Sequence, residues 1–236
     1  MKPNGEGKEE MIMREDEEIP EEFLKQMTER HRQAVEKLAA LKVRTTTLTE
    51  QEDRKRVLDL LRTHSFKRGK FTLSSGKESD FYLDCKKALT TTGLACIGSL
   101  FSGLIVKKFA DIQGVGGMTM GADPLAVATC LCAGMFYDVE WQAFYVRKEP
   151  KKHGTEQWIE GPALDEGARV VIVEDVITTG ASAIKAIQRA RIHRLNPVLV
   201  LALVDRCEDD GRQNIEAEGL PVCPLFTRQD FIPDGA

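Results

Sequence analysis

Residues 170–182 (VVIVEDVITTGAS) combine side chains that could bind a phosphorylated sugar. An apolar run leads to two adjacent carboxylates, Glu174 and Asp175, which cannot both face a hydrophobic core without a large desolvation cost. The small residues that follow are expected to open a helix, with Gly180 allowing a sharp turn. Free N–H groups at a helix start attract anions. The pattern therefore predicts a phosphate cup beside two acids that accept hydrogen bonds from sugar hydroxyls.

A blander interpretation of the same segment is that Glu174 and Asp175 only cap the next helix. Two acids after an all-apolar strand, followed by a run of small residues, favour the sugar-phosphate interpretation. Other phosphate motifs do not compete with it. Residues 114–119 (GVGGMT) lack the third glycine of a dinucleotide fingerprint, and the sequence contains no G-K-[ST].

A second segment, residues 146–161 (VRKEPKKHGTEQWIEG), gathers positive charge directly ahead of the acidic strand. Its cations and its titratable histidine are Arg147, Lys148, Lys151, Lys152 and His153. Gly154 could act as a hinge. Taken alone, the segment could be a solvated basic loop, but its position between two predicted strands favours a role at the same site.

The elements that would position these residues follow from the periodicity of the apolar residues. Strands are expected at 112–120, 141–146, 169–173, 198–204 and 222–226, and helices at 92–109, 124–135, 181–194 and 212–218. Residues 70–84 form an irregular strand region, Thr49-x-x-Glu52 is a capping box, and Asn196-Pro197 ends a helix. Repeated strand–helix units predict an α/β fold, with a central, mostly parallel sheet flanked by helices and ligands at the carboxyl ends of the strands.

The N-terminal part of the chain differs from the rest. Residues 1–20 are acidic and without period, which predicts a disordered tail, and residues 21–42 have the spacing of an amphipathic helix. That helix could pack on the main domain, fray, or form a docking face. We expect a helical extension over 1–48 and one domain over 49–236.

Composition excludes several classes of function. A net charge of −4 argues against nucleic-acid binding, and no apolar run reaches the ~20 residues that span a membrane. The six cysteines form no C-x-x-C pair, which is typical of reduced thiols. With an acidic N-terminus unlike a targeting peptide, this predicts a cytoplasmic protein.

Residues 170–182 resemble the signature for phosphoribosyl pyrophosphate (PRPP) in type I phosphoribosyltransferases. The resemblance implies that fold, with Glu174 and Asp175 on the ribose hydroxyls and Asp175 among the catalytic residues. The PRPP contacts that it implies here are Glu174, Asp175, Val176, Ile177, Thr178, Thr179, Gly180, Ala181 and Ser182.

The basic segment, with its pattern R-K-x-x-K-x-H-G, resembles the mobile catalytic loop of orotate phosphoribosyltransferases. The resemblance implies contacts to pyrophosphate and to the transition state from Arg147, Lys148, Lys151, Lys152 and His153. Lys151 and His153 would be catalytic. In that family the loop, here 147–161, reaches into the neighbouring subunit, which implies a homodimer.

Three more stretches resemble the same family, and the resemblance covers about residues 49–231. Residues 71–77 with 81–84 look like its small base-binding hood, and residues 116–124 occupy the place of its pyrophosphate loop. Val204-Asp205-Arg206 matches the family's L-D-R, whose arginine faces the orotate carboxylate. Tyr82 and Thr178 would also contact orotate. The alternative for Arg206 is a surface salt bridge to Asp205 or Glu208.

The chain departs from many relatives at two positions, where Ser74 and Gly121 replace lysines. The implied reaction joins orotate to the ribose of PRPP in UMP biosynthesis, with Mg²⁺ carried on PRPP and no direct metal ligand from the protein. The alternatives are a phosphoribosyltransferase for uracil or a purine, and a regulator that binds PRPP without turnover.

Overall fold

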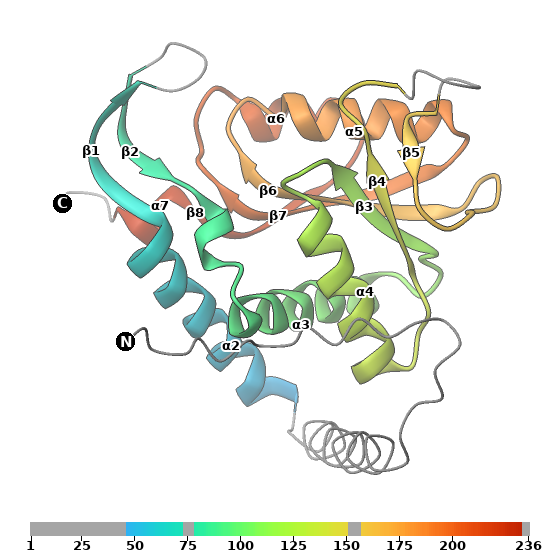
Figure 1. Ribbon diagram of the computed structural model, residues 1–236, viewed down its shortest axis with the longest axis horizontal. Helices are drawn as coiled ribbons and strands as arrows, with labels where there is room; N and C mark the ends of the chain where they lie inside the picture. The colour runs from blue at the N-terminus through green and yellow to red at the C-terminus, as the bar shows by residue number, and fades with distance from the viewer. Residues whose placement is uncertain (1–45, 73–77, 151–156, 233–236) are drawn as a thin grey trace, which may run out of the picture. The chain divides into compact units, whose positions relative to one another are not determined.

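The computed structural model describes residues 46–72, 78–150 and 157–232 (Figure 1). The predicted acidic tail and the predicted helix at 21–42 lie outside these residues. The same is true of Ser74 and of Lys151, Lys152 and His153 in the basic segment.

A six-stranded sheet lies at the centre of the described chain, in the order β5-β4-β3-β6-β7-β8. Its strands are β3 (Gly114–Met118), β4 (Gln142–Val146), β5 (Ile159–Glu160), β6 (Arg169–Ile177), β7 (Asn196–Asp205) and β8 (Val222–Thr227). The neighbours from β4 to β8 are parallel, and only the short β5 runs antiparallel to β4. The predicted mostly parallel sheet is therefore confirmed.

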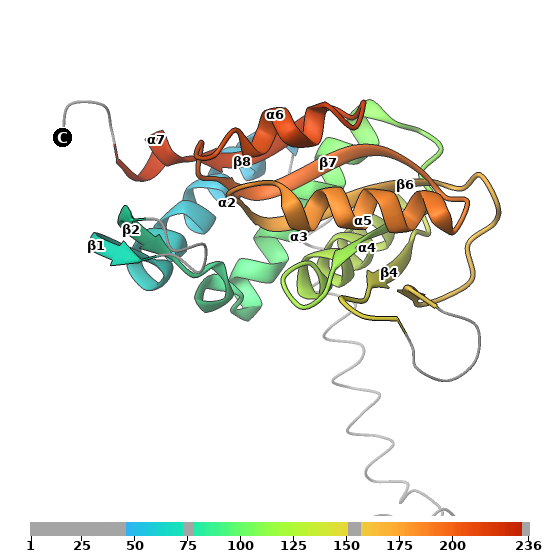
Figure 2. The same ribbon diagram turned by 90° about the horizontal axis from the view of Figure 1, so that it is seen from above.

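Helices cover both faces of this sheet (Figures 1 and 2). They are α3 (Thr91–Lys108) and α4 (Asp123–Tyr137) on one face, and α5 (Ala181–Ile192) and α6 (Gly211–Glu216) on the other. Side chains of β6 alternate between the two layers: Val171 and Val173 pack with α3 and α4, whereas Val170 and Ile172 pack with α5. A strand that is buried on both faces needs the continuous apolar run seen in the sequence.

A small hood precedes the sheet. It consists of α2 (Thr46–Leu60), a π-helical turn (Leu61–Ser65), and the antiparallel strands β1 (Phe66–Thr72) and β2 (Glu78–Leu83). A 3-10 turn (Cys85–Ala88) then leads to α3, and α7 (Arg228–Phe231) follows β8. Phe66 joins the hood to α7, because its ring lies 5.5 Å from that of Phe231 and 5.8 Å from that of Phe81.

Several predicted boundaries are wrong. β6 does not end at residue 173 but continues to Ile177, so Glu174 and Asp175 lie within the strand. Thr49 is not a helix cap, because α2 already begins at Thr46. Asn196 and Pro197 belong to β7, and the left-handed residue after α5 is Arg194.

No helix in the described ranges is long and apolar enough to cross a bilayer. All six cysteines are free thiols, and Cys207 is the exposed one.

Candidate active site

The direction of chain crossover changes between β3 and β6. The chain leaves β3 towards β4 on one side and leaves β6 towards β7 on the other. In an open parallel sheet, such a switch point forms a crevice at the carboxyl ends of the strands. The predicted pyrophosphate loop follows β3 at this edge, and the two acids of β6 lie beside it.

The loop lies directly against one of the two acids, Asp175. A Cβ atom added to Gly121 would lie 2.6 Å from Oδ1 of Asp175. The Asp175 carboxylate therefore fills the space that a side chain at position 121 would need. This contact gives a physical reason for glycine at position 121.

Glu174 and Asp175 have different environments. The Glu174 side chain is buried, at 6% exposed, whereas Asp175 is half-buried. Burial, and then the charge of Asp175, raise the pKa of Glu174 well above its usual value, while Lys148 acts in the opposite direction. Within the described residues, Oε2 of Glu174 has no hydrogen-bond partner. A buried carboxyl oxygen of this kind is poised to bond a ligand hydroxyl.

The residues of the predicted phosphate cup lie at the start of α5. Gly180 has a φ of +79°, the left-handed conformation that favours glycine, and the helix begins at Ala181. Thr179, Ala181 and Ser182 are exposed. The first N–H groups of a helix have no intrahelical acceptor and can bind an anion. Asn214 of α6 was not predicted from the sequence. Its Nδ2 donates to the Thr179 carbonyl at 3.1 Å and so fixes the backbone just before α5.

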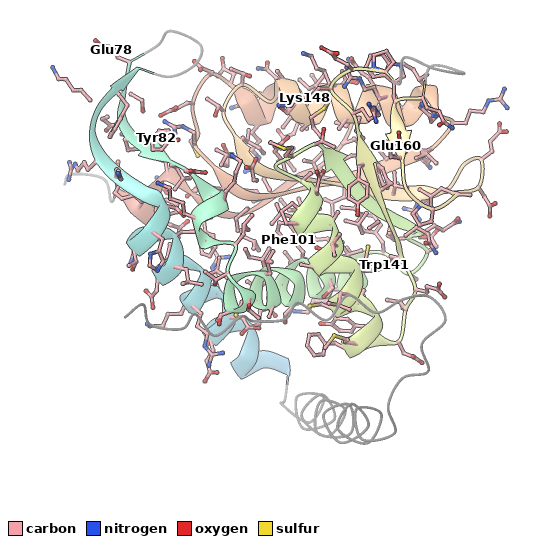
Figure 3. All side chains as sticks on the ribbon, viewed as in Figure 1. Glu78, Tyr82, Phe101, Trp141, Lys148 and Glu160 are labelled. Atoms are coloured by element: carbon pink, nitrogen blue, oxygen red, sulfur yellow. The ribbon has the colours of Figure 1, made fainter. Side chains whose placement is uncertain are left out.

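The described part of the basic segment lies beyond the end of β4. Lys148, labelled in Figure 3, is exposed, and its charge lowers the pKa of Glu174, against the effects of burial and of Asp175. Arg147 pairs with Glu160 of β5 at 3.1 Å. The predicted contacts of Lys151, Lys152 and His153 cannot be placed relative to these groups, because the three residues are outside the described ranges.

The structure contains the salt bridge to Glu208 that was the alternative for Arg206, but Arg206 is buried, at 3% exposed, so the pair does not lie at the surface. Its Nε does pair with Glu208 at 2.8 Å, and Nη2 donates to the Ser79 hydroxyl at 2.8 Å and the Phe81 carbonyl at 3.3 Å. Its guanidinium carbon lies 4.0 Å from the centre of the Phe81 ring. Arg206 thus connects the end of β7 to the hood.

Tyr82 is on the other face of the hood strand. Exposure alternates along β2, so that Ser79 and Phe81 are buried while Tyr82 is 40% exposed (Figure 3). The structure therefore does not bring Tyr82 to Arg206, and its predicted contact with orotate stays a prediction. Sequence reasoning missed Ser79, Phe81 and Glu208 as partners of Arg206. The two-residue alternation over 78–83 was the available signal for the first two.

Carboxyl oxygens are ligands that Mg²⁺ accepts, and one or two of them are enough for an ion that arrives on a phosphate ligand. Among the residues that the structure describes, no three His, Cys, Asp or Glu side chains are grouped as metal ligands. Glu174 and Asp175 still offer carboxyl oxygens next to the cup.

Comparisons with known proteins agree on one family. No protein-family model matches the chain. Two curated relatives are orotate phosphoribosyltransferases: that of Sorangium cellulosum is 44% identical over 184 residues (77% of this chain, 94% of the relative), and that of Nostoc sp. is 38% identical over 199 residues (84% and 94%).

Solved structures extend the similarity to the fold. A crystal structure of Mycobacterium tuberculosis H37Rv orotate phosphoribosyltransferase with Fe(III) dicitrate matches 76% of this chain and 99% of its own, with a TM-score of 0.66 and 37% identity. Another structure of that enzyme, in complex with PRPP, matches 76% and 92%, with a TM-score of 0.60 and 30% identity. With curated relatives this similar over nearly their whole length, the chain belongs to the orotate phosphoribosyltransferase family and has the type I phosphoribosyltransferase fold.

Proposed function

We propose that this chain transfers the phosphoribosyl group of PRPP to orotate, giving orotidine 5′-monophosphate and pyrophosphate for UMP biosynthesis. One observation carries the proposal: a buried carboxyl group with an unpartnered oxygen, a second carboxylate and the start of α5 meet at the switch point of the sheet. This arrangement suits a phosphorylated ribose better than a bare anion or a nucleobase.

The sugar and its phosphate would bind to separate groups. The unpartnered Oε2 of the Glu174 carboxyl would accept a hydrogen bond from one ribose hydroxyl. Asp175 would accept from the neighbouring hydroxyl. The 5′-phosphate would sit on the N–H groups of 179–182, where the positive end of the helix dipole favours negative charge.

In the reaction the bond from C1 of the ribose to the diphosphate oxygen breaks, and the leaving group takes the electron pair. N1 of orotate forms the new bond to C1 with inversion and loses its proton. A magnesium ion carried on PRPP would neutralise charge on the departing diphosphate. We assign the binding of the departing diphosphate to four cations: Arg147, Lys148, Lys151 and Lys152. His153 would donate a proton or a hydrogen bond to the same group.

For the base, we assign the orotate carboxylate to Arg206. The guanidinium is already fixed by Glu208, the hood strand and the Phe81 ring, so little conformational freedom is lost when a substrate binds. Nε and Nη2 already donate to Glu208, Ser79 and Phe81, so the orotate carboxylate would accept a charge-assisted hydrogen bond from Nη1, whereas uracil and purines offer no carboxylate. Thr178 and Tyr82 remain proposed orotate contacts.

We further propose a homodimer that shares the 147–161 loop across subunits: Lys148 stays on the side of Glu174 in its own chain, and the loop beyond it reaches the partner's site. Apolar side chains exposed near the pyrophosphate loop support a covered surface there: Met120 (72% exposed), Val127 (45%) and Leu131 (61%). Val127 and Leu131 are four residues apart on α4 and share one face of it. The division at residue 48 and a cytoplasmic location also stay proposals, as does the lack of nucleic-acid and membrane partners.

The test is release of pyrophosphate from the full chain with PRPP and Mg²⁺, with each candidate base in a separate reaction. We expect release with orotate and not with uracil, adenine or hypoxanthine. Release with another base alone would reject orotate but keep the phosphoribosyltransferase chemistry. Binding of PRPP without release for any base would favour the regulator.

A further inference from the structure

One arginine of α5 holds both ends of the basic segment. The Arg189 side chain is half-buried, and its Nη1 donates to the carbonyl of Arg147, while Nη2 donates to the carbonyl of Lys148 at 3.1 Å. Its guanidinium carbon lies 4.0 Å from the centre of the Trp158 ring. The entry and the exit of the segment are therefore in contact with a single side chain.

Neighbouring contacts reinforce this junction. The backbone N–H of Trp158 donates to Nε2 of His193, just after α5, at 3.3 Å. The N–H of Arg147 donates to the Trp158 carbonyl at 2.8 Å, which brings the two ends together. β5, which follows Trp158 within the segment, pairs with the end of β4. Figures 1 and 2 both place β4 beside α5.

α5 is also the helix whose first residues form the phosphate cup. Ala181 and Arg189 are eight residues apart, which corresponds to about 12 Å along a helix. We infer that Arg189 is a positioning residue, which fixes the ends of the basic segment, at Arg147–Lys148 and at Trp158, to the helix that binds the 5′-phosphate. Its effect on catalysis rests on the proposed function, but the anchoring itself does not.

The chemistry of the contact requires arginine. Two carbonyls accept from two nitrogens of one planar group, and the flat face of that group covers an indole ring. A lysine ammonium is a point charge without a planar fork, so it can replace only part of these contacts. The hydrogen bond from Arg189 fixes the backbone of Lys148. The exposed Lys148 side chain therefore extends from a fixed backbone position, from which its charge acts on Glu174.

The test uses three variants of the full-length protein. Arg189→Met keeps much of the aliphatic stem and removes the fork, and Arg189→Lys keeps the charge. Arg191→Met is the matched control: it lies two residues further along α5 and also makes a paired contact, to the carboxylate and carbonyl of Glu218, both at 2.7 Å, away from the segment. Each is compared for kcat and for KM of PRPP and of orotate.

A second measurement reports on the anchoring directly. The chain has two tryptophans, Trp141 and Trp158, so a Trp141→Phe background leaves Trp158 as the fluorescent reporter. Loss of the guanidinium from its ring should shift Trp158 emission to longer wavelength as water gains access. The shift should occur with Arg189→Met and not with Arg191→Met.

We expect Arg189→Met to lower kcat/KM for PRPP by about tenfold to a hundredfold, since misplaced groups far from the reacting atoms have effects of this size. KM for orotate should stay within about twofold, and Arg189→Lys should restore part of the loss. Equal kinetic losses in Arg189→Met and Arg191→Met would overturn the inference, as would a kinetic loss without a change at Trp158. If the wild-type protein releases no pyrophosphate, the proposed function is rejected. The anchoring is then tested by Trp158 emission alone: a shift in Arg189→Met supports it, and no shift rejects it.

Discussion

At the scale of single residues, the site depends on two acids that are adjacent in sequence but differ in environment. Glu174 is almost fully buried and Asp175 is only half-buried, because successive residues of a strand point to different sides. The buried Glu174 has an oxygen without a partner among the described residues, whereas Asp175 is more accessible, so the two acids can accept from neighbouring ribose hydroxyls from different sides.

Burial of Glu174 should make the stability of the fold depend on pH. Because its folded pKa is raised, the folded chain keeps a proton that the unfolded chain has lost. The contribution of protonated Glu174 to the free energy of unfolding is therefore fully present below the ordinary glutamate pKa. It is lost as pH rises through the folded pKa. Glu174→Gln carries no such proton, so its stability advantage over wild type should grow by up to about 1.4 kcal/mol per pH unit in this window. Urea unfolding from pH 4 upwards measures this difference, and parallel pH profiles would contradict it.

Arg206 should determine the affinity for orotate. Arg206→Lys replaces the fork that contacts Glu208 and Ser79 with a point charge, so KM for orotate should rise by about tenfold or more. KM for PRPP should change by less than about twofold, because PRPP binds to other groups. Glu208→Gln is the companion variant: it keeps an acceptor for Nε and should have a smaller effect. An unchanged KM for orotate in Arg206→Lys would remove this residue from the base site.

At the scale of elements, the phosphate cup requires glycine for two separate reasons. Gly180 is left-handed, and a Cβ atom on it would lie 2.5 Å from the carbonyl oxygen of Gly211. Gly167 has a similar φ of +81° but would meet nothing within 4 Å. A substitution at Gly167 therefore introduces backbone strain alone, whereas one at Gly180 introduces the same strain together with a steric clash.

We expect Gly167→Ala to cost about 1 kcal/mol of stability, from the left-handed backbone alone. Gly180→Ala should cost about 1–3 kcal/mol more, because the backbone of α6 must move. Only Gly180→Ala should raise KM for PRPP. Thermal unfolding with kinetics on both variants measures these effects, and equal costs without a change in KM would argue against a cup that depends on this contact.

The sequence predicted the elements better than the contacts between them. Continuous apolar runs identified β3, β6 and β7, and the small residues identified the start of α5. The end of β6 was misplaced because one buried acid within a strand breaks the apolar pattern without ending the strand. The contacts of Arg206 with Ser79 and of Arg189 with Lys148 could not be predicted, because the two partners are far apart in the sequence. They are separated by 127 and 41 residues, respectively.

At the scale of the whole molecule, the part of the 147–161 loop beyond Lys148 would complete the site of a partner subunit. Mixed dimers test this arrangement. Lys151→Ala and Asp175→Asn should each be nearly inactive alone, because each damages one half of every composite site. After subunit exchange at equal amounts, half of the dimers are hybrids with one intact site, so about a quarter of wild-type activity should return. No recovery after confirmed exchange would mean that both residues act in the same subunit.

A crystal of the full chain soaked with PRPP tests the central assignment most directly. We predict the 5′-phosphate on the N–H groups of 179–182, the ribose hydroxyls on Glu174 and Asp175, and the diphosphate towards the loop after β3. PRPP bound with its phosphate away from the start of α5, or with its ribose out of reach of both acids, would contradict the account.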